Sequence, residues 1–286
     1  MELDVSVLAK ARRVVVKVGT SNLTHPNGRM HLGHMEGLVR QLCDLTGGGR
    51  EVVLVTSAAI AAGMGRLGMT ERPPGLAEKQ ALAAIGQGWL MQSYEKLFAE
   101  YGVTVAQILL TREDLEDPER RANAAETMDL LLRWRVVPIV NENDTVANEE
   151  IRVGDNDTLS ARVAGLVGAD LLVILSDVDG LYPADPRENP DLKPLRIVEE
   201  LTGAIWLAAG GAGSANGTGG MRTKLAAAEI CLARGIPMVI ASGRRQGVLA
   251  EVVSGHRIPG TLFVPPRLGA KPAGAGGGSG ERGSAK

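Results

Sequence analysis

The residues best suited to handling a phosphate group lie in a glycine-rich stretch, Gly217 to Lys224, at the start of an expected helix. Glycines let backbone N–H groups approach an anion, the helix N-terminus adds about half a positive charge, and Lys224 supplies a full one. The spacing differs from the GxxxxGK[ST] pattern, which argues against a P-loop. A glycine run also fits a flexible loop before an ordinary helix, so the other polar clusters decide.

Polar side chains follow four expected strands. Lys17 ends the first strand beside a Gly-Thr-Ser turn, and a lysine there is costly unless its ammonium group meets an anion. Ser57 follows the second strand at an expected helix N-cap position, where plain capping is the simpler explanation. Amides and carboxylates gather at 141–144 and again at 149–157, where a surface hairpin is the alternative. Ser176-Asp177 follows the fifth strand and either orients a cation or a ribose or caps a turn.

The elements that must position these groups alternate between short β-branched runs and helical patterns. The expected strands are Arg13–Val18, Glu51–Thr56, Val103–Leu109, Val136–Val140, Leu171–Ser176 and Pro237–Ala241. The expected helices are His31–Thr46, Leu76–Tyr101, Glu119–Arg133, Thr158–Val167 and Arg222–Arg234. This alternation predicts an α/β fold, a three-layer αβα sandwich with a largely parallel central sheet. Ligands of such sheets bind at the carboxyl ends of the strands, where the polar clusters fall.

Composition narrows the class of protein. The 286 residues carry 31 Lys+Arg against 33 Asp+Glu with no basic block, which argues against a nucleic-acid partner. Cys43 and Cys231 each lie in an apolar helical pattern, as buried thiols of a reducing cytoplasm would. The sequence shows no leader-like apolar segment and no run of about 18 apolar residues, so we expect a cytoplasmic protein with no membrane contact.

Taken together, the clusters resemble the amino acid kinase family and, within it, the glutamate 5-kinase branch. The matching segments are Val16–Ser21, Asn141–Asp144, Ile151–Asp157, Ser176-Asp177 with Gly180–Tyr182 and Ala184–Pro186, and Gly217–Lys224. They span roughly residues 10 to 265. The NEND and VGDND segments followed by GTGGM and Thr-Lys are much more specific to this branch than the N-terminal lysine motif, which many relatives share.

The resemblance implies ATP-dependent phosphorylation of the γ-carboxylate of L-glutamate, the first step of proline biosynthesis. By analogy, Lys17 and Lys224 stabilise the transferring phosphoryl group and Asp157 orients both ammonium groups, while Ser57, Asp144 and Asn156 bind glutamate. The implied ATP-binding residues are Lys17, Ser176, Asp177, Thr218, Gly219, Gly220, Met221, Arg222, Thr223 and Lys224. Mg²⁺ is expected to be carried mainly by the nucleotide, without a protein metal ligand. The nucleophile is already an anion, so no protein base is expected, and the four histidines are spread along the chain.

The sequence departs from the family in two places. Where relatives usually have Ser-Gly-Ala, this chain has Ala58, whose Cβ is expected to displace the substrate slightly or to accompany a helical φ. The compact pattern ends near Val264, and residues 268–286 form a Gly/Ala-rich tail that cannot bury enough apolar area to fold. We therefore expect a kinase domain at 1–267, a disordered tail at 268–286 and no C-terminal PUA domain.

Other functions remain open at this stage. Acetylglutamate kinase, aspartokinase and uridylate kinase would share the lysine pair and the fold. A non-catalytic amino-acid sensor would keep the pocket, although retention of both lysines and Asp157 argues against it. Relatives also imply feedback inhibition by proline and a homo-oligomer, a dimer or a tetramer.

Overall fold

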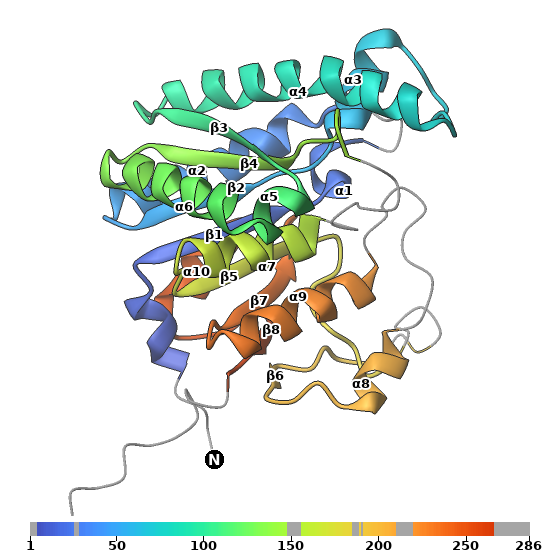
Figure 1. The fold of residues 1–286 in the computed structure, drawn as a ribbon. Coiled ribbons are helices and arrows are strands. Elements are labelled where there is room, and N and C mark those ends of the chain that lie inside the picture. Colours follow the sequence, from blue (N-terminus) through green and yellow to red (C-terminus); the bar gives the residue numbers. More distant parts are fainter. Residues whose placement is uncertain are drawn as a thin grey trace, which may run out of the picture.

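The computed structural model describes residues 5–25, 29–147, 156–184, 189, 191–209 and 220–265. Its strands are β1 (Arg13–Val18), β2 (Glu51–Val55), β3 (Val105–Leu110), β4 (Val137–Glu142), β5 (Leu171–Ser176), β6 (Ile197–Val198), β7 (Met238–Ser242) and β8 (Gly260–Phe263). They form a single sheet in the order β3-β4-β2-β1-β5-β7-β8-β6. All described pairings are parallel except β7 with β8 (Figure 1).

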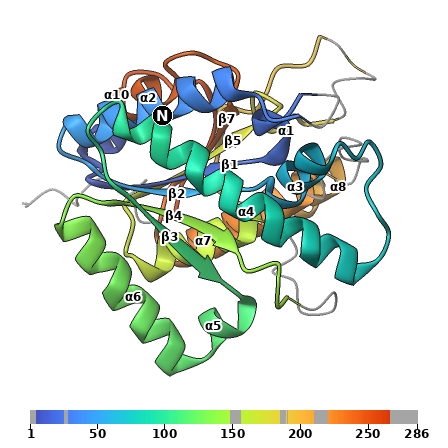
Figure 2. The same ribbon diagram turned by 90° about the horizontal axis from the view of Figure 1, so that it is seen from above.

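The helices cover both faces of this sheet. They are the 3₁₀ segment η1 (Val5–Lys10), α1 (Thr20–Leu23), α2 (Leu32–Gly47), α3 (Ala59–Leu67), α4 (Leu76–Ala99), α5 (Arg112–Glu116), α6 (Pro118–Arg133), α7 (Asn156–Leu166), α8 (Gly203–Ala208), α9 (Met221–Ala233) and α10 (Val248–Ser254). One apolar cluster joins α2, α4 and α10 to one face, and a second joins α6, α7 and α9 to the other. Figure 2 shows α2 and α10 on one side of the strands and α6 on the opposite side. The predicted three-layer sandwich is confirmed.

The strands alternate between the two clusters, residue by residue. In β1, Val14, Val16 and Val18 pack in the first cluster, whereas Val15 packs in the second. Successive side chains of a strand point to opposite faces of the sheet, and helices cover both faces here. Side chains on either face are therefore buried, which explains the continuous apolar run of β1. Lys17 interrupts that run at the carboxyl end of the strand, paired in register with Val55 of β2 and Ile174 of β5. The lysine therefore emerges at the centre of the sheet.

Helices α3 and α4 approach closely because each has a glycine that faces the backbone of the other helix. A Cβ on Gly86 would lie 1.8 Å from the carbonyl oxygen of Ala59, and one on Gly63 would lie 2.0 Å from that of Leu82. Neither distance leaves room for a methyl group. Only residues 56–58 connect β2 to α3, so this contact holds the start of α3 at the carboxyl edge of the sheet.

All six expected strands and all five expected helices are present, with ends shifted by up to two residues. Among the described residues, no helix is both long enough and apolar enough to cross a membrane. The expected tail at 268–286 lies outside the described residues.

Candidate active site

Two lysines and one aspartate meet at the carboxyl edge of the sheet. Lys17 comes from the end of β1, Asp157 from the first turn of α7 and Lys224 from the first turn of α9. The Nζ of Lys17 lies 2.6 Å from Oδ1 of Asp157, and the Nζ of Lys224 lies 3.1 Å from Oδ2. The structure thus brings together the three residues expected to be catalytic.

These charges are almost completely removed from water. Lys17 is 4% exposed, Lys224 is 6% exposed and Asp157 is fully buried. Burying a charge is unfavourable unless a partner compensates it, and here one carboxylate pairs with two ammonium groups. The trio keeps one excess positive charge, and the N-terminal ends of α7 and α9 add partial positive charge. Such a site attracts a polyanion such as a nucleotide phosphate.

A hydrogen-bond network connects Asn156, at the start of α7, to two neighbouring strand ends. Its Nδ2 lies 2.7 Å from the carbonyl oxygen of Thr56, 2.9 Å from Oγ of Ser57 and 3.0 Å from Oδ1 of Asn141. Asn141 ends the apolar run of β4 and is itself buried. Two of the expected substrate residues, Ser57 and Asn156, are therefore in direct contact, and Asn156 immediately precedes Asp157 in the sequence.

Helix α4 supports this network with two residues that the sequence analysis missed. Gln87 accepts a hydrogen bond from Nδ2 of Asn141 at 2.9 Å, and the hydroxyl of Tyr94 lies 2.8 Å from Oγ1 of Thr56. Burial raises the pKa of Tyr94, so its hydroxyl stays protonated and able to hydrogen-bond. No local pattern marks either residue, because their role depends on the packing of α4 against α3.

Ala58 does not have the right-handed helical φ that was one expectation for it. Its φ of 80° and ψ of 10° are left-handed, not right-handed helical, and it serves as the N-cap of α3 in place of Ser57. Its side chain is buried and belongs to the apolar cluster on the α2 and α4 face. The turn therefore keeps the backbone shape that a glycine would favour, and the methyl group packs into the core.

Asp144, Ser176 and Asp177, which were also expected to bind substrate or nucleotide, lie at the same edge. Asp144 is in the turn after β4, which is closed by a hydrogen bond from the backbone N–H of Ala147 to the carbonyl oxygen of Asn143 at 3.2 Å. Ser176 ends β5 and is buried, and its hydroxyl donates to Oδ1 of Asp177 at 3.1 Å.

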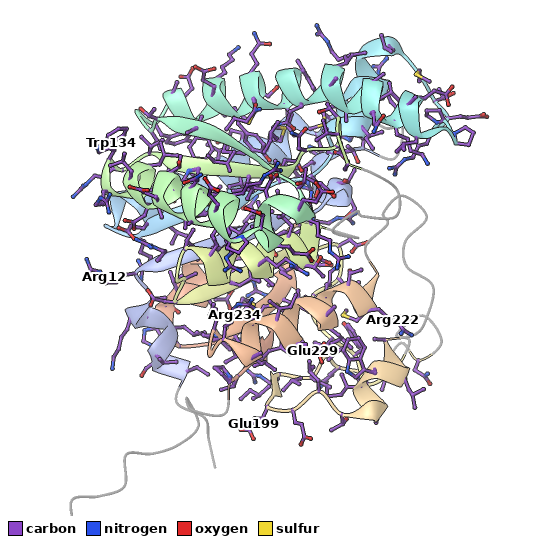
Figure 3. All side chains as sticks on the ribbon, in the orientation of Figure 1. Arg12, Trp134, Glu199, Arg222, Glu229 and Arg234 are labelled. Carbon is purple, nitrogen blue, oxygen red and sulfur yellow. The ribbon has the colours of Figure 1, made fainter. Side chains whose placement is uncertain are left out.

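The glycine-rich loop is described only from Gly220 onward, so Thr218 and Gly219 lie outside the described residues. Gly220 is the N-cap of α9, and Met221 packs partly against the second apolar cluster. Arg222 is exposed at the start of α9, on the side of the molecule where α8 lies (Figure 3). Thr223 turns inward, and its hydroxyl donates to Oδ2 of Asp157 at 2.9 Å.

The cysteines and histidines described below contact neither the two lysines nor Asp157 in any hydrogen bond or ion pair given for the described residues. Both cysteines are buried, as expected, and burial raises the pKa of Cys43 to about 11 and that of Cys231 to about 12, so both are protonated near neutral pH. Three of the four histidines are not scattered: the rings of His25, His31 and His34 stack at centroid separations of 4.0 Å. His31 also accepts the backbone N–H of His34 and so caps α2.

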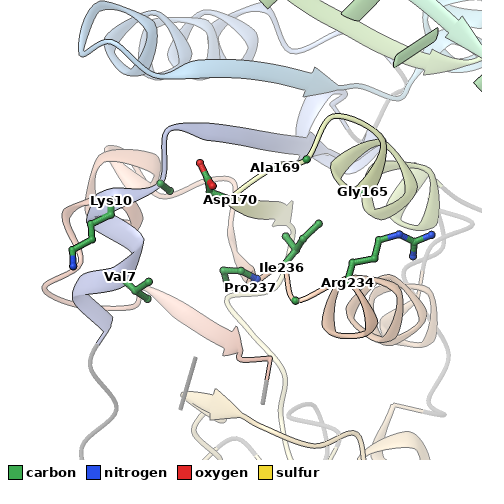
Figure 4. Close-up of a pocket in the computed structure, with 11 residues that line it drawn as sticks. Val7, Lys10, Gly165, Ala169, Asp170, Arg234, Ile236 and Pro237 are labelled. Carbon is green, nitrogen blue, oxygen red and sulfur yellow. The ribbon is translucent and has the colours of Figure 1, made fainter. Parts of the chain in front are cut away.

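Two cavities flank the sheet. The larger, of about 590 Å³, lies at the amino-terminal edge, between the end of η1 and the turns before β5 and β7. Lys10 and Arg234 lie on opposite sides of it, and Asp170 lies between them (Figure 4). The smaller, of about 370 Å³, lies at the carboxyl ends of β3 and β4, lined by residues of α5 and by Glu142 and Asn143. Of these two cavities, which described residues line, the smaller adjoins the edge that carries the candidate site.

Curated relatives are similar over most of the chain. A glutamate 5-kinase of Symbiobacterium thermophilum is 64% identical over 256 residues, which are 90% of this chain and 97% of that protein. A glutamate 5-kinase of Moorella thermoacetica is 58% identical over 258 residues, 90% of this chain but 68% of that longer protein. The chain thus matches both short and long proteins of this name.

Solved structures share the fold at low identity. Carbamate kinase from Giardia lamblia, bound to AMP-PNP, superposes with a TM-score of 0.63 at 17% identity, covering 90% of this chain and 99% of that one. A UMP kinase from Bacillus anthracis gives a TM-score of 0.61 at 16% identity, covering 90% and 97%. The sequence profile of the amino acid kinase family matches residues 12–242. That match includes the β1 lysine, Asp157 and Lys224, and the chain therefore belongs to the amino acid kinase family.

Proposed function

We propose that the protein transfers the γ-phosphoryl group of ATP to the γ-carboxylate of L-glutamate, giving γ-glutamyl phosphate and ADP, the first step of proline biosynthesis. The observation that carries the proposal is the buried Asp157 between Lys17 and Lys224, beside the Ser57 and Asn156 pair. The relatives named glutamate 5-kinase, at 58% and 64% identity, point to the same substrate.

The reaction needs alignment and charge stabilisation rather than a protein base. A γ-carboxylate oxygen of glutamate attacks the γ-phosphorus and forms the new O–P bond. The bond from that phosphorus to the β,γ-bridging oxygen breaks, and ADP leaves with the electron pair. No proton has to be removed from the nucleophile, because a carboxylate is ionised near neutral pH. The protein must hold two anions together and stabilise the charge that spreads over the transferring group.

Each member of the charged trio has a role in this scheme. Lys17, at the end of the central strand, holds the transferring phosphoryl group, and Lys224 neutralises charge on the leaving β-phosphate side. Asp157 keeps the two ammonium groups apart and oriented, since it contacts both through different oxygens. The nucleotide lies over Ser176, Asp177 and the loop that leads into α9.

Magnesium fits the site as a companion of the nucleotide. Within the described part of the chain, no group of three or more His, Cys, Asp or Glu side chains is arranged to hold a metal ion. Asp157 pairs with two lysines, and Mg²⁺ would be held mainly by phosphate oxygens and water, which suits an ion that sheds water reluctantly. When bound, Mg²⁺ neutralises charge on the β- and γ-phosphate oxygens.

A coupled ADP-release assay tests the substrate. Glutamate, N-acetylglutamate, aspartate and UMP are offered in turn at saturating MgATP, and glutamate is expected to give the highest kcat/KM. Preferred turnover of any other acceptor would assign the chain to another enzyme of the family. Binding of glutamate without turnover of any acceptor would indicate a sensor.

Asp144 is proposed to pair with the α-ammonium group of glutamate, while Ser57 and Asn156 hydrogen-bond its carboxylate oxygens. Asp144→Asn removes the negative charge and keeps the shape, so glutamate binding is expected to weaken by about 2 kcal/mol or more, roughly 30-fold in KM. The KM for ATP should change little. Initial-rate kinetics measure both constants, with Asp44→Asn on the exposed side of α2 as the control.

The pairing with Asp144 also predicts the order of two substrates. N-acetylglutamate lacks the α-ammonium charge, so the unmodified enzyme should phosphorylate it less well than glutamate. Better turnover of N-acetylglutamate would contradict the assignment of Asp144.

Proline is proposed as a feedback inhibitor that competes with glutamate. Proline shares the α-carboxylate and the cationic nitrogen of glutamate, the groups that Asp144 and its neighbours would hold. Inhibition is expected to rise with proline and to be relieved by glutamate, with or without residues 268–286. A proline titration at several glutamate concentrations checks this, and an insensitive enzyme would refute it. The proposal places the enzyme in the cytoplasm as a homodimer or homotetramer, which light scattering on the purified protein would distinguish.

A further inference from the structure

The hydroxyl of Thr223 lies between two acceptors in the first turn of α9. Its Oγ1 is 2.7 Å from the carbonyl oxygen of Gly220 and 2.9 Å from Oδ2 of Asp157. A hydroxyl has one hydrogen to donate, so these two acceptors compete for it. The bond to Asp157 is charge-assisted and therefore the stronger of the two. Thr223 is thus engaged with the carboxylate rather than directed toward a nucleotide.

Bound phosphate would compete with Asp157 for two of its described partners. The described contacts of Asp157 to Lys17 and Lys224 are ion pairs, and both ammonium groups would also be attracted to the phosphates of a bound nucleotide. Thr223 is an uncharged donor to the same Oδ2 that Lys224 contacts. An uncharged hydroxyl is not attracted to phosphate as an ammonium group is, so this bond can hold the carboxylate while the lysines turn toward the phosphates.

We propose that Thr223 is a positioning residue, whose hydroxyl holds Asp157 in the orientation that directs Lys17 and Lys224 at the transferring phosphoryl group. This inference rests on the phosphotransfer roles proposed above for the two lysines. It assigns to Thr223 a function distinct from the nucleotide contact that its place in the glycine-rich loop suggests. It also ties the first turn of α9 to that of α7, so that Lys224 and Asp157 move together.

Two substitutions separate the hydroxyl from the rest of the side chain. Thr223→Val keeps the branched shape and removes the donor, and it is expected to lower kcat by about 10-fold or more, because a misaligned catalytic group is costly. Its KM for ATP should stay within about threefold, since binding that is equal in ground and transition states is not lost. Thr223→Ser retains the donor and should keep kcat within about threefold of the unmodified enzyme. Equal losses in both variants, or a loss confined to the KM for ATP, would overturn the proposal.

A matched control tests for a purely helical role. Thr46, near the end of α2, donates to the carbonyl oxygen of Cys43 at 2.8 Å, the same three-residue spacing that links Thr223 to Gly220. If the hydroxyl of Thr223 only stabilised a helix, Thr46→Val and Thr223→Val would both lower the melting temperature and both leave kcat intact. Loss of kcat in Thr223→Val alone supports the positioning role.

The coupling to Asp157 gives the sharpest readout. Adding Thr223→Val to an Asp157→Asn variant should cause less than about a twofold further loss of kcat, since neighbours that act as one unit are not additive. A full additional loss in the double variant would contradict action through Asp157. The binding of AMP-PNP, measured by calorimetry without an acceptor, should be unchanged by Thr223→Val. The acceptor panel on the unmodified enzyme is run first, so that a wrong substrate is recognised separately and the kinetics use the acceptor that turns over.

Discussion

Replacing Lys17 or Lys224 with methionine is expected to lower kcat by at least about 100-fold, with a smaller effect on the KM for glutamate. In the proposed mechanism both ammonium groups act on charge that develops during phosphoryl transfer, in a site where burial strengthens electrostatic interactions. Methionine keeps most of the side-chain length and removes the ammonium group, with its charge and its hydrogen-bond donors. Steady-state kinetics on each variant measure kcat and KM separately.

The control for this experiment is Lys96→Met, which removes an exposed lysine of α4 and should leave kcat unchanged. Each lysine variant also leaves Asp157 with one fewer cation, so thermal unfolding must confirm that the variants are folded at the assay temperature. A folded Lys17→Met or Lys224→Met enzyme with near-normal kcat would refute the proposed mechanism.

Gly86→Ala is expected to destabilise the protein by about 3 kcal/mol or more, because overpacking against backbone cannot be relieved by a side-chain movement. The new Cβ would lie 1.8 Å from the carbonyl oxygen of Ala59 and 2.5 Å from the backbone nitrogen of Gly63. Helix α3 must then move away from α4. Since α3 starts immediately after Ser57 and Ala58, we also expect a higher KM for glutamate in any folded fraction.

Gly88→Ala is a matched control on the same helix. A Cβ at Gly88 meets nothing within 4 Å, so alanine there should stabilise α4 by about 0.5 to 1 kcal/mol through helix propensity alone. Urea denaturation of the two variants compares the free energies of unfolding directly. Similar values for both would show that the α3 and α4 contact is softer than its geometry indicates.

How much the sequence predicts depends on whether an element is specified locally. The buried strands and long helices have clear periodicity, and their positions follow from it to within two residues. By contrast, α3 has the sequence AIAAGMGRL, whose small residues and two glycines give a weak helical signal. Its stability comes from packing against α4, which no local pattern reveals. The missed β6 has only two residues, and β8 reads as the end of the compact region until its pairing with β7 is known.

Some features of the candidate site are likewise evident from the sequence, and others only from the structure. The resemblance identifies Lys17, Asp157 and Lys224. In the structure the carboxylate of Asp157 lies 2.6 Å from the Nζ of Lys17 and 3.1 Å from the Nζ of Lys224. The inward direction of Thr223 and the support of Asn141 by Gln87 depend on rotamers and on distant segments. Sequence spacing carries no information on either.

The left-handed Ala58, the N-cap residue between β2 and α3, has a consequence for how freely this position can vary. Holding a residue with a Cβ at a φ of 80° costs about 1 kcal/mol or more in the folded protein. Glycine avoids that strain but has more conformational freedom to lose on folding, by roughly 0.5 to 1 kcal/mol. The two costs nearly cancel, and the alanine methyl recovers some apolar burial in the core. Exchange between glycine and alanine at position 58, next to Ser57, is therefore expected to change the free energy of unfolding little.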